Sequence, residues 1–196
     1  MRKTFTAIVT AHDQDIGPMI LNLHSQTRKP DQIKVYWSGD SSYGQAKLFH
    51  DEEINMADLP FYASKQPNMN DWGHEKRDIG LRAASGDFVG FFNADDWYNE
   101  KYIEKMMKEA EDCETGLVYC WWRSKDQMFA PCQPILGSST SGNFIVDRDV
   151  AKFIGYWQGR HYEADGKFIE EAVVGSRVLG KVVTQVREIL YHHNAR

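Results

Sequence analysis

Residues 75–96 read EKRDIGLRAASGDFVGFFNADD and contain the clearest alternation of structure in the chain. The segment 75–84 is typical of a helix that stops at Ser85-Gly86. Residues 88–92 form a short, fully apolar run, which is typical of a buried strand. A polar loop with two carboxylates, Asp95 and Asp96, follows at once. Helix, buried strand and polar loop in this order predict one unit of an α/β sheet.

The same alternation continues on both sides of this segment. Residues 4–10 are rich in β-branched side chains and, together with 32–37 and 60–65, predict three further strands. Pro18 marks a first helical turn, and apolar residues recur at helical spacing over 102–110. Strands that alternate with helices predict an α/β fold with a central, mostly parallel sheet flanked by helices.

The second half of the chain is less regular, but it shows no repeat and no linker between two cores. It predicts strands over 117–122 and 181–191, helices over 149–154 and 165–179, and a long connection near 131–142. We expect a single domain over residues 1–196, because a chain of this length with 42% hydrophobic residues can bury one core.

Polar loops follow three of the predicted strands, at residues 11–17, 38–43 and 93–99. In an open parallel sheet, ligands bind beyond the carboxyl ends of the strands. We therefore expect the three loops to meet in one crevice.

The composition excludes several classes of protein. With 28 acidic against 23 basic residues the net charge is −5, which excludes a broadly basic nucleic-acid binder. No apolar run approaches the about 18 residues of a membrane span, and the N-terminus lacks the apolar stretch of a signal peptide. The three cysteines form no C-x-x-C pair, which favours reduced thiols. We expect a cytoplasmic protein without stable membrane insertion, in a bacterium or, if phage-encoded, in the host cytoplasm.

The adjacent carboxylates Asp95 and Asp96 allow two interpretations. Mg²⁺ and Mn²⁺ prefer hard oxygen ligands and typically bridge one or two carboxylates to substrate phosphates. Alternatively, the two residues cap the helix that follows, where negative charge is favourable. The spacing alone favours neither interpretation.

Other catalytic motifs are missing or incomplete. The run HEKRD at 74–78 resembles the helix of zinc proteases but lacks the second histidine. The chain contains no G-x-G-x-x-G, no P-loop and no G-x-S-x-G motif. Dinucleotide-dependent redox, ATPase and α/β-hydrolase functions therefore have no support.

Three segments in order, FTAIVTAHD at 5–13, LHSQT at 23–27 and residues 75–96, resemble family 2 glycosyltransferases. The most specific part is the pattern R-x-x-G-x-x-x-A-x-G from Arg77 to Gly86, with the acidic loop after it. The resemblance covers about residues 4–110. It implies a GT-A fold and an enzyme that uses a nucleotide-diphosphate sugar. About residues 1–110 would bind this donor, and about 111–196 would hold the acceptor and the catalytic base.

The resemblance also implies roles for individual residues. Arg77 would lie near the base and the diphosphate, where a fixed cationic fork is useful. Asp96 is the first choice of ligand for Mn²⁺ or Mg²⁺, and Asp95 would contact the metal or the ribose. The residues that would bind the nucleotide sugar are Thr10, Ala11, His12, Ser38, Arg77, Asn93 and Asp95.

Within the donor half, the chain differs from the family pattern at two places. Asn93 stands where an aspartate is more usual, and residues 37–40 read Trp-Ser-Gly-Asp where the family usually has Asp-Asp-Gly-Ser. The second difference falls on the site that recognises the base. The resemblance favours a UDP-sugar, with base recognition open to change.

The second half must supply the catalytic base, because an inverting transfer needs a carboxylate that takes the proton of the acceptor hydroxyl. The family places an acidic pair at the start of a helix. Residues 162–168, YEADGKF, resemble that position, with alanine where the first acid usually stands. The resemblance implies Asp165 as the base and Glu163 as the next candidate. The alternative is a solvated, acid-rich helix start.

Members of this fold often use a C-terminal histidine as a further contact for the metal or diphosphate. His192 and His193 follow the last predicted strand, and neutral imidazole is a suitable ligand. We favour His193 as a metal ligand; a surface histidine pair is the alternative.

The acceptor is predicted to be a saccharide, with a hydroxymethylated base in DNA, as used by bacteriophage enzymes, as the alternative. Residues 142–196 hold eight Lys/Arg and seven Asp/Glu, so the acidity lies mostly in the first half. A non-catalytic nucleotide-sugar-binding module and a nucleotidyltransferase are further alternatives. Aromatic side chains would form a wall that stacks on sugars or bases, or would belong to the core. They are Trp97, Trp121, Trp122, Phe144, Phe153, Tyr156, Trp157, Tyr162 and Phe168.

Overall fold

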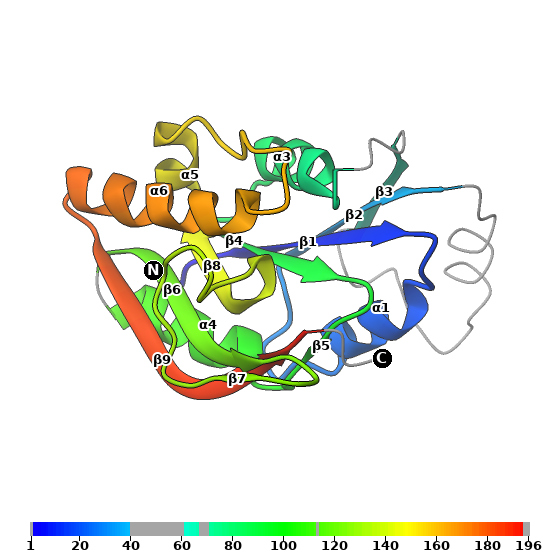
Figure 1. Cartoon of the computed structure of the whole chain (residues 1–196), viewed down its shortest axis with the longest axis horizontal. Helices are drawn as coiled ribbons and strands as arrows, with labels where there is room; N and C mark the ends of the chain where they lie inside the picture. The colour runs from blue at the N-terminus through cyan, green and yellow to red at the C-terminus, as the bar shows by residue number, and fades with distance from the viewer. Residues whose placement is uncertain (1, 40–60, 67–70, 113, 194–196) are drawn as a thin grey trace.

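A computed structural model describes residues 2–39, 61–66, 71–112 and 114–193. Over these ranges the chain forms a nine-stranded sheet with α3, α5 and α6 on one face and α1 and α4 on the other (Figure 1). The strands are β1 Phe5–His12, β2 Gln32–Ser38, β3 Phe61–Lys65, β4 Phe88–Asn93, β5 Trp97–Tyr98, β6 Thr115–Arg123, β7 Met128–Phe129, β8 Phe144–Asp147 and β9 Val182–His192. The helices are α1 Gly17–His24, α3 His74–Ala83, α4 Tyr102–Asp112, α5 Arg148–Phe153 and α6 Ala164–Val178, with a 3₁₀ turn at Ser141–Asn143.

The strand order is β3-β2-β1-β4-β8-β6-β9-β5, with β7 paired to β6. The strands β3, β2, β1 and β4 all run parallel. Beyond β4 the sheet is mixed, because β8 is antiparallel to both β4 and β6, whereas β9 is parallel to β6. The predicted α/β fold with a central sheet flanked by helices is confirmed. The expectation of a mostly parallel sheet holds only for the part formed by β3, β2, β1 and β4, because β8, β7 and β5 all pair antiparallel to their neighbours.

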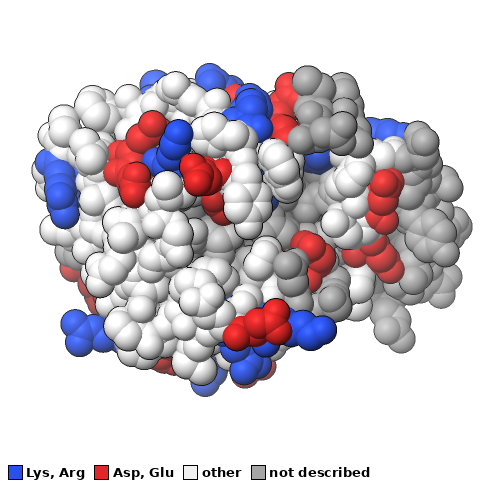
Figure 2. All heavy atoms as spheres, in the orientation of Figure 1, with Lys and Arg blue, Asp and Glu red and all other residues white. Residues whose placement is uncertain are grey.

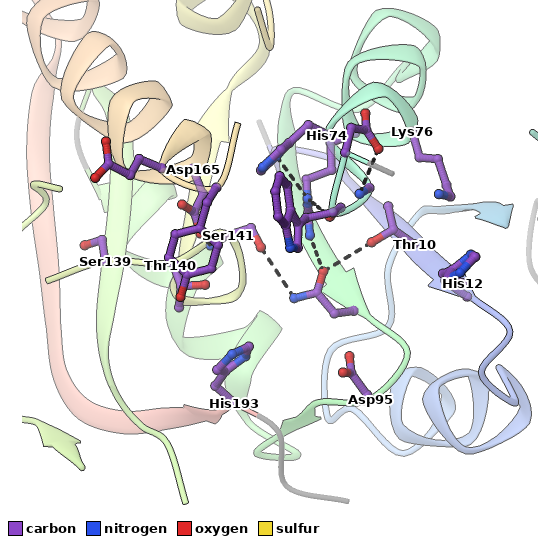
Figure 3. A pocket seen from close by; sticks show the side chains of 18 of the residues that line it. Thr10, His12, His74, Lys76, Asp95, Ser139, Thr140, Ser141, Asp165 and His193 are labelled. Atoms are coloured by element: carbon purple, nitrogen blue, oxygen red, sulfur yellow. Dashed lines mark hydrogen bonds between the residues drawn. The ribbon is translucent and has the colours of Figure 1, made fainter. Parts of the chain in front are cut away.

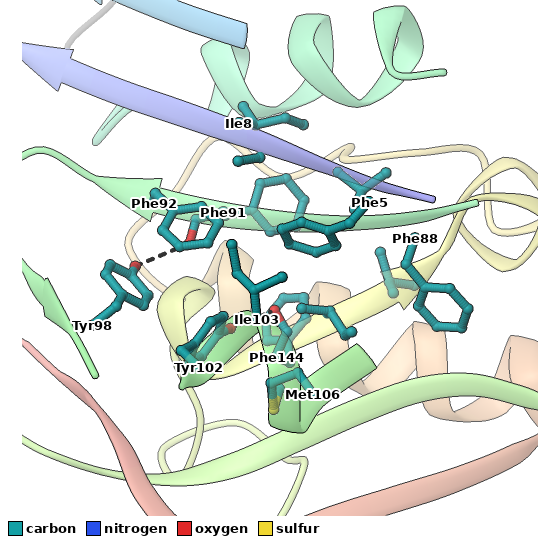
Figure 4. Close-up of a cluster of buried hydrophobic side chains, with 14 of the residues drawn as sticks. Phe5, Ile8, Phe88, Phe91, Phe92, Tyr98, Tyr102, Ile103, Met106 and Phe144 are labelled. Carbon is teal, nitrogen blue, oxygen red and sulfur yellow. Dashed lines mark hydrogen bonds between the residues drawn. The ribbon is translucent and has the colours of Figure 1, made fainter. Parts of the chain in front are cut away.

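Aromatic side chains fix β4 from both faces (Figure 4). The ring of Phe92 packs on Tyr98 and Tyr102, with centroid distances of 4.4 and 5.7 Å. On the other face, Phe91 contacts Trp157 at 4.9 Å. Such aromatic contacts stabilise a core beyond the area they bury. Part of the predicted aromatic wall is therefore core: Phe144, Trp157 and Phe168 are buried.

Gly80, the glycine of the R-x-x-G pattern, lies where α3 crosses β1. A Cβ atom at this position would be 2.7 Å from Ile8 Cγ2. Glycine therefore allows a close approach of helix and strand that any side chain would prevent. This contact sets how far the N-terminal turn of α3, which carries Arg77, reaches over the end of β1.

The strands β1 and β4 end at the same edge of the sheet, with Thr10 opposite Asn93. The predicted meeting of the loops that follow them is confirmed, since His12, Gln14 and Asp95 line one pocket. Residues 40–43 of the third loop lie outside the described residues. In the part of the chain that the structure describes, no helix is long and apolar enough to cross a membrane.

Candidate functional site

A pocket of about 950 Å³ lies at the carboxyl ends of β1 and β4 (Figure 3). The first half of the chain contributes the end of β1, the start of α3 and the end of β4; the second half contributes the start of α6 and the residue after β9. The predicted site residues that line it are Thr10, Ala11, His12, Arg77, Asn93, Asp95, Glu163, Asp165 and His193. Ser38 and Asp96 lie behind this lining and are fully buried.

Asn93 connects the two sides of the pocket floor. Its Oδ1 accepts hydrogen bonds from Arg77 Nη2 at 2.7 Å and from Thr10 Oγ1 at 3.2 Å. Its Nδ2 donates to Asp96 Oδ2 at 2.7 Å and to Ser141 Oγ at 3.4 Å. An amide suits this position because it accepts on one side and donates on the other. An aspartate here would place a second carboxylate against that of Asp96 in place of the donating amide.

Arg77 is a buried cation that contacts neutral groups. Besides Asn93, Nη1 donates to the Trp72 carbonyl at 2.9 Å and lies 3.3 Å from His74 Nδ1. The described residues offer no carboxylate within ion-pair distance of it. Burial lowers its pKa, although Asp165 and other acidic groups oppose this. The pocket therefore holds a fixed positive charge with spare capacity for an anion.

Asp96 lies beneath the pocket and is 0% exposed. Its Oδ2 accepts from Asn93 and, at 2.6 Å, from the Tyr191 hydroxyl; Oδ1 is 3.1 Å from His193 Nδ1. The helix-cap interpretation of these carboxylates is wrong, because residues Trp97–Tyr98 form β5 and α4 begins only at Tyr102. Asp95, in contrast, lines the pocket.

The two C-terminal histidines point to different places. His193 lines the pocket, and its pKa is raised, first by the hydrogen bond to Asp96 and also by the charges of Asp95 and Asp165. His192 Nδ1 accepts from Arg123 Nε at 2.8 Å, and its ring packs on Trp97. The side chain that faces the acidic pocket is therefore that of His193.

Asp165 lies in the first turn of α6. Its carboxylate accepts from its neighbour Gly166 N at 2.9 Å and from Ser141 N at 3.3 Å. These two N–H groups fix its orientation at the pocket wall. Glu163 is the residue before the helix and is exposed, with no capping hydrogen bond from its side chain.

The loop before α3 brings an aromatic side chain to the pocket mouth. Trp72 and Gly73 have φ values of 53° and 82°, and a left-handed tryptophan is uncommon. The Asp71 carboxylate accepts from Gly73 N at 3.1 Å and Glu75 N at 2.6 Å, which holds the turn and caps α3. Trp72 is 62% exposed and meets Tyr162, 76% exposed, edge to face at 5.9 Å. Both line the pocket.

His74 is a neutral acceptor behind Arg77. Its Nδ1 receives Trp157 Nε1–H at 3.2 Å and faces Arg77 Nη1, so the ring proton belongs on Nε2. Burial, and then the charge of Arg77, lowers its pKa from 6.5 to about 3. A neutral imidazole here leaves the positive charge of the site on Arg77.

This buried histidine predicts a pH dependence of stability. Between pH 6.5 and about 3 the unfolded chain binds a proton at His74 that the folded chain does not. The free energy of unfolding should therefore fall as the pH falls through this window, by up to about 1.4 kcal/mol per pH unit from this group. His74→Asn, which keeps an acceptor but does not titrate, should show a flatter dependence in urea unfolding. Equal slopes for the two proteins would contradict the assignment.

Several pocket residues were not predicted from the sequence. They come from the loop and first turn of α3 and from the segment before β8: Trp72, His74, Lys76, Ser139, Thr140 and Ser141. The polar run near 138–142 was visible in the sequence, but only as a connection. Its place in the pocket follows from β8, which brings this segment back beside β4.

Comparison with known proteins identifies the family. Residues 65–169, more than half of the chain, match the model of glycosyl transferase family 2. The chain therefore belongs to this family. It is 46% identical over 106 residues to the putative glycosyltransferase EpsH of Bacillus subtilis (strain 168), an alignment that covers 54% of this chain and 25% of EpsH. The chain thus aligns with a quarter of this curated relative.

Solved structures confirm the GT-A-type fold. S. aureus TarS 1–349 in complex with UDP has a TM-score of 0.74 at 16% identity, covering 97% of this chain and 60% of TarS 1–349. The mannosyltransferase PcManGT from Pyrobaculum calidifontis, in complex with GDP-Man and Mn²⁺, has a TM-score of 0.76 at 15% identity. The alignment covers all of this chain and 58% of PcManGT.

Proposed function

We propose that this chain transfers a sugar from a nucleoside-diphosphate sugar to a hydroxyl group of a saccharide, with inversion at the anomeric carbon. The observation that supports this most is the convergence of Arg77, Asp95 and Asp165 on one pocket at the carboxyl ends of parallel strands. Family membership and structural neighbours that hold UDP, UDP-GlcNAc or GDP-Man support the class of donor. A UDP-sugar remains the favoured donor.

The donor half of the pocket suits a diphosphate. Arg77 presents a buried guanidinium whose described partners are neutral, so an anionic ligand would complete its pairing. In the reaction the bond between the anomeric carbon and the diphosphate oxygen breaks, and negative charge grows on the leaving group. A fixed cation at this place stabilises that charge.

The residues also suit a divalent ion. Among the described residues, no three His, Cys, Asp or Glu side chains form a cluster that could hold a metal alone. Mg²⁺ and Mn²⁺ are often held by one or two carboxylates together with substrate phosphates and water. We propose Asp95 and His193 as the protein contacts, with Asp96 orienting His193 from below. When bound, the ion would neutralise charge on the diphosphate.

Asp95→Asn is expected to remove the dependence of nucleotide binding on the metal. In wild-type protein, Mn²⁺ should raise the affinity for UDP, and chelation should reverse this. The variant should lose at least about tenfold of that gain, because it lacks the charged ligand. Asp126→Asn, in the exposed turn between β6 and β7, is the matched control. Calorimetric titration with and without EDTA measures the effect, and an unchanged metal response would exclude Asp95.

Asp165 is the proposed general base. Its carboxylate, fixed by two N–H groups at the start of α6, would take the proton of the acceptor hydroxyl as that oxygen attacks the anomeric carbon. The pair formed by Trp72 and Tyr162 lies at the mouth of the same pocket. Exposed aromatic faces at this place would stack on the acceptor.

The surface favours a saccharide over DNA as acceptor. In the view of Figure 2, the Lys and Arg side chains of the described residues lie scattered around the edges and form no continuous track. Binding of a nucleic acid strand relies on several phosphate contacts. An uncharged acceptor needs none, and the aromatic pair serves it directly.

The direct test is transfer itself. We incubate the protein and Mn²⁺ with a panel of UDP- and GDP-sugars and with neutral oligosaccharides or DNA that contains hydroxymethylated bases. Mass spectrometry then measures the masses of the products. We expect the mass of one glycosyl residue to be added to a saccharide. Addition to DNA would reassign the acceptor, and donor binding with no product would support a binding module.

A further inference from the structure

Lys76 is a buried cation in the pocket wall. It is 4% exposed, lies on α3 next to Arg77 and lines the pocket. No residue in the described ranges forms a hydrogen bond or ion pair with its ammonium group. Burial is the largest influence on its pKa, which is lowered. The stem of Lys76 is buried, but its Nζ is not among the buried polar atoms that lack a partner, so the ammonium group opens onto the pocket. A ligand in the pocket is therefore its natural partner.

Lys76 and His193 lie on opposite sides of the pocket. Figure 3 shows Lys76 reaching toward Thr10 and His12, whereas Asp165 and His193 lie across the cavity. The charges around the groups agree with this view. The charges that act on the pKa of Lys76 are those of Asp71, Arg77 and Glu75. The charges that act on the pKa of His193 are those of Asp96, Asp95 and Asp165.

The way the donor lies along the pocket determines which of its groups reaches Lys76. Under the proposed function, the diphosphate lies near Asp95 and His193, and the sugar lies near Asp165. The nucleoside extends to the other end of the pocket, where Lys76 and His12 lie. An ammonium group has three donors and no acceptor. It donates a hydrogen bond to a carbonyl oxygen, whereas an amino group at the same place would present a second donor and repel it.

We propose that Lys76 determines base specificity by donating to the keto oxygen of the donor's nucleobase. Uracil and guanine carry a carbonyl at the ring position where cytosine and adenine carry an amino group. The site should therefore accept UDP or GDP and reject CDP and ADP. This inference rests on the proposed function, because it assumes that a nucleoside diphosphate occupies the pocket.

The test compares nucleotides that differ at this one group. Affinities of UDP and CDP, and of GDP and ADP, are measured by calorimetry with Mn²⁺ for wild type, Lys76→Met and Lys76→Arg. Lys108→Met, which removes an exposed lysine on α4, is the matched control. We expect wild type to bind one keto nucleotide at least about tenfold more tightly than its amino counterpart. Lys76→Met should lose this preference by weakening the keto nucleotide alone, and Lys76→Arg, which keeps a donor, should retain it.

Other outcomes overturn the inference. Equal weakening of UDP and CDP in Lys76→Met would assign Lys76 to the phosphates, and equal binding of both by wild type would show that the base is not selected here. The affinities of uridine and cytidine, which lack phosphates, show whether Lys76 contacts the base or the phosphates. Failure of wild type to bind any nucleotide would instead refute the proposed function. Circular dichroism spectra and melting temperatures identify a variant that fails to fold, and Lys76→Arg then provides the comparison.

Discussion

Replacement of Asp165 by asparagine is expected to lower the turnover number of sugar transfer by about 10²–10⁴-fold, the range of general base catalysis. The amide keeps the shape of the side chain, and its single oxygen can still accept from Gly166 N, so the first turn of α6 should be kept. Only the longer hydrogen bond from Ser141 N, which donates to the other carboxylate oxygen, is lost. The amide cannot take up a proton from the acceptor. Binding of the donor nucleotide should therefore match that of wild type.

Two controls make this result specific. Glu163→Gln changes the other acidic side chain of this segment that lines the pocket, and Glu171→Gln changes an exposed acid further along α6. We expect both to retain most of the turnover. A large loss in Glu163→Gln, with activity retained in Asp165→Asn, would transfer the role to Glu163. Turnover near wild type in both variants would exclude a base at this helix start.

Arg77→Met should weaken nucleoside-diphosphate binding by about 100-fold, the cost of removing one partner of a buried, charge-assisted contact. Methionine fills similar space but carries no charge. The substitution also removes the hydrogen bond from Arg77 to Asn93 Oδ1, and so releases the amide group that contacts Asp96. Affinity for UDP, measured by calorimetric titration, is the direct readout.

Arg82→Met is the matched control for Arg77→Met. Arg82 lies on the same helix but outside the pocket, where it pairs with Asp78 and stacks on Tyr156. It should affect stability more than affinity. Arg77→Lys keeps the positive charge but lacks the planar guanidinium group. An affinity between those of wild type and Arg77→Met would show that both the charge and the guanidinium geometry contribute to binding. Unchanged affinity in Arg77→Met would show that the diphosphate lies elsewhere.

The elements of the first half could be predicted because local signals and tertiary contacts agree there. An apolar run such as that in β4 is buried on both faces of a parallel sheet, and helices that connect such strands stop at polar turns. The strand β8 was missed because it has only four residues and follows a run of small polar residues. Its place between β4 and β6 depends on antiparallel contacts far apart in the sequence.

The site could be predicted to the level of which loops meet, and less well to the level of single side chains. Neighbouring residues at a strand end point in different directions. Asp95 therefore faces the pocket while Asp96 lies beneath it, and His193 faces it while His192 packs on Trp97. Lys76 was missed because an isolated lysine in a helix is usually solvated.

The most direct test of the proposed activity is the release of nucleoside diphosphate from UDP- and GDP-sugars, measured with Mn²⁺ and a saccharide acceptor for wild type and Asp165→Asn side by side. We predict release by wild type from at least one donor, dependence on the divalent ion, and loss of release in the variant while donor binding persists. Tight donor binding by wild type with no release, or equal release by both proteins, would contradict it.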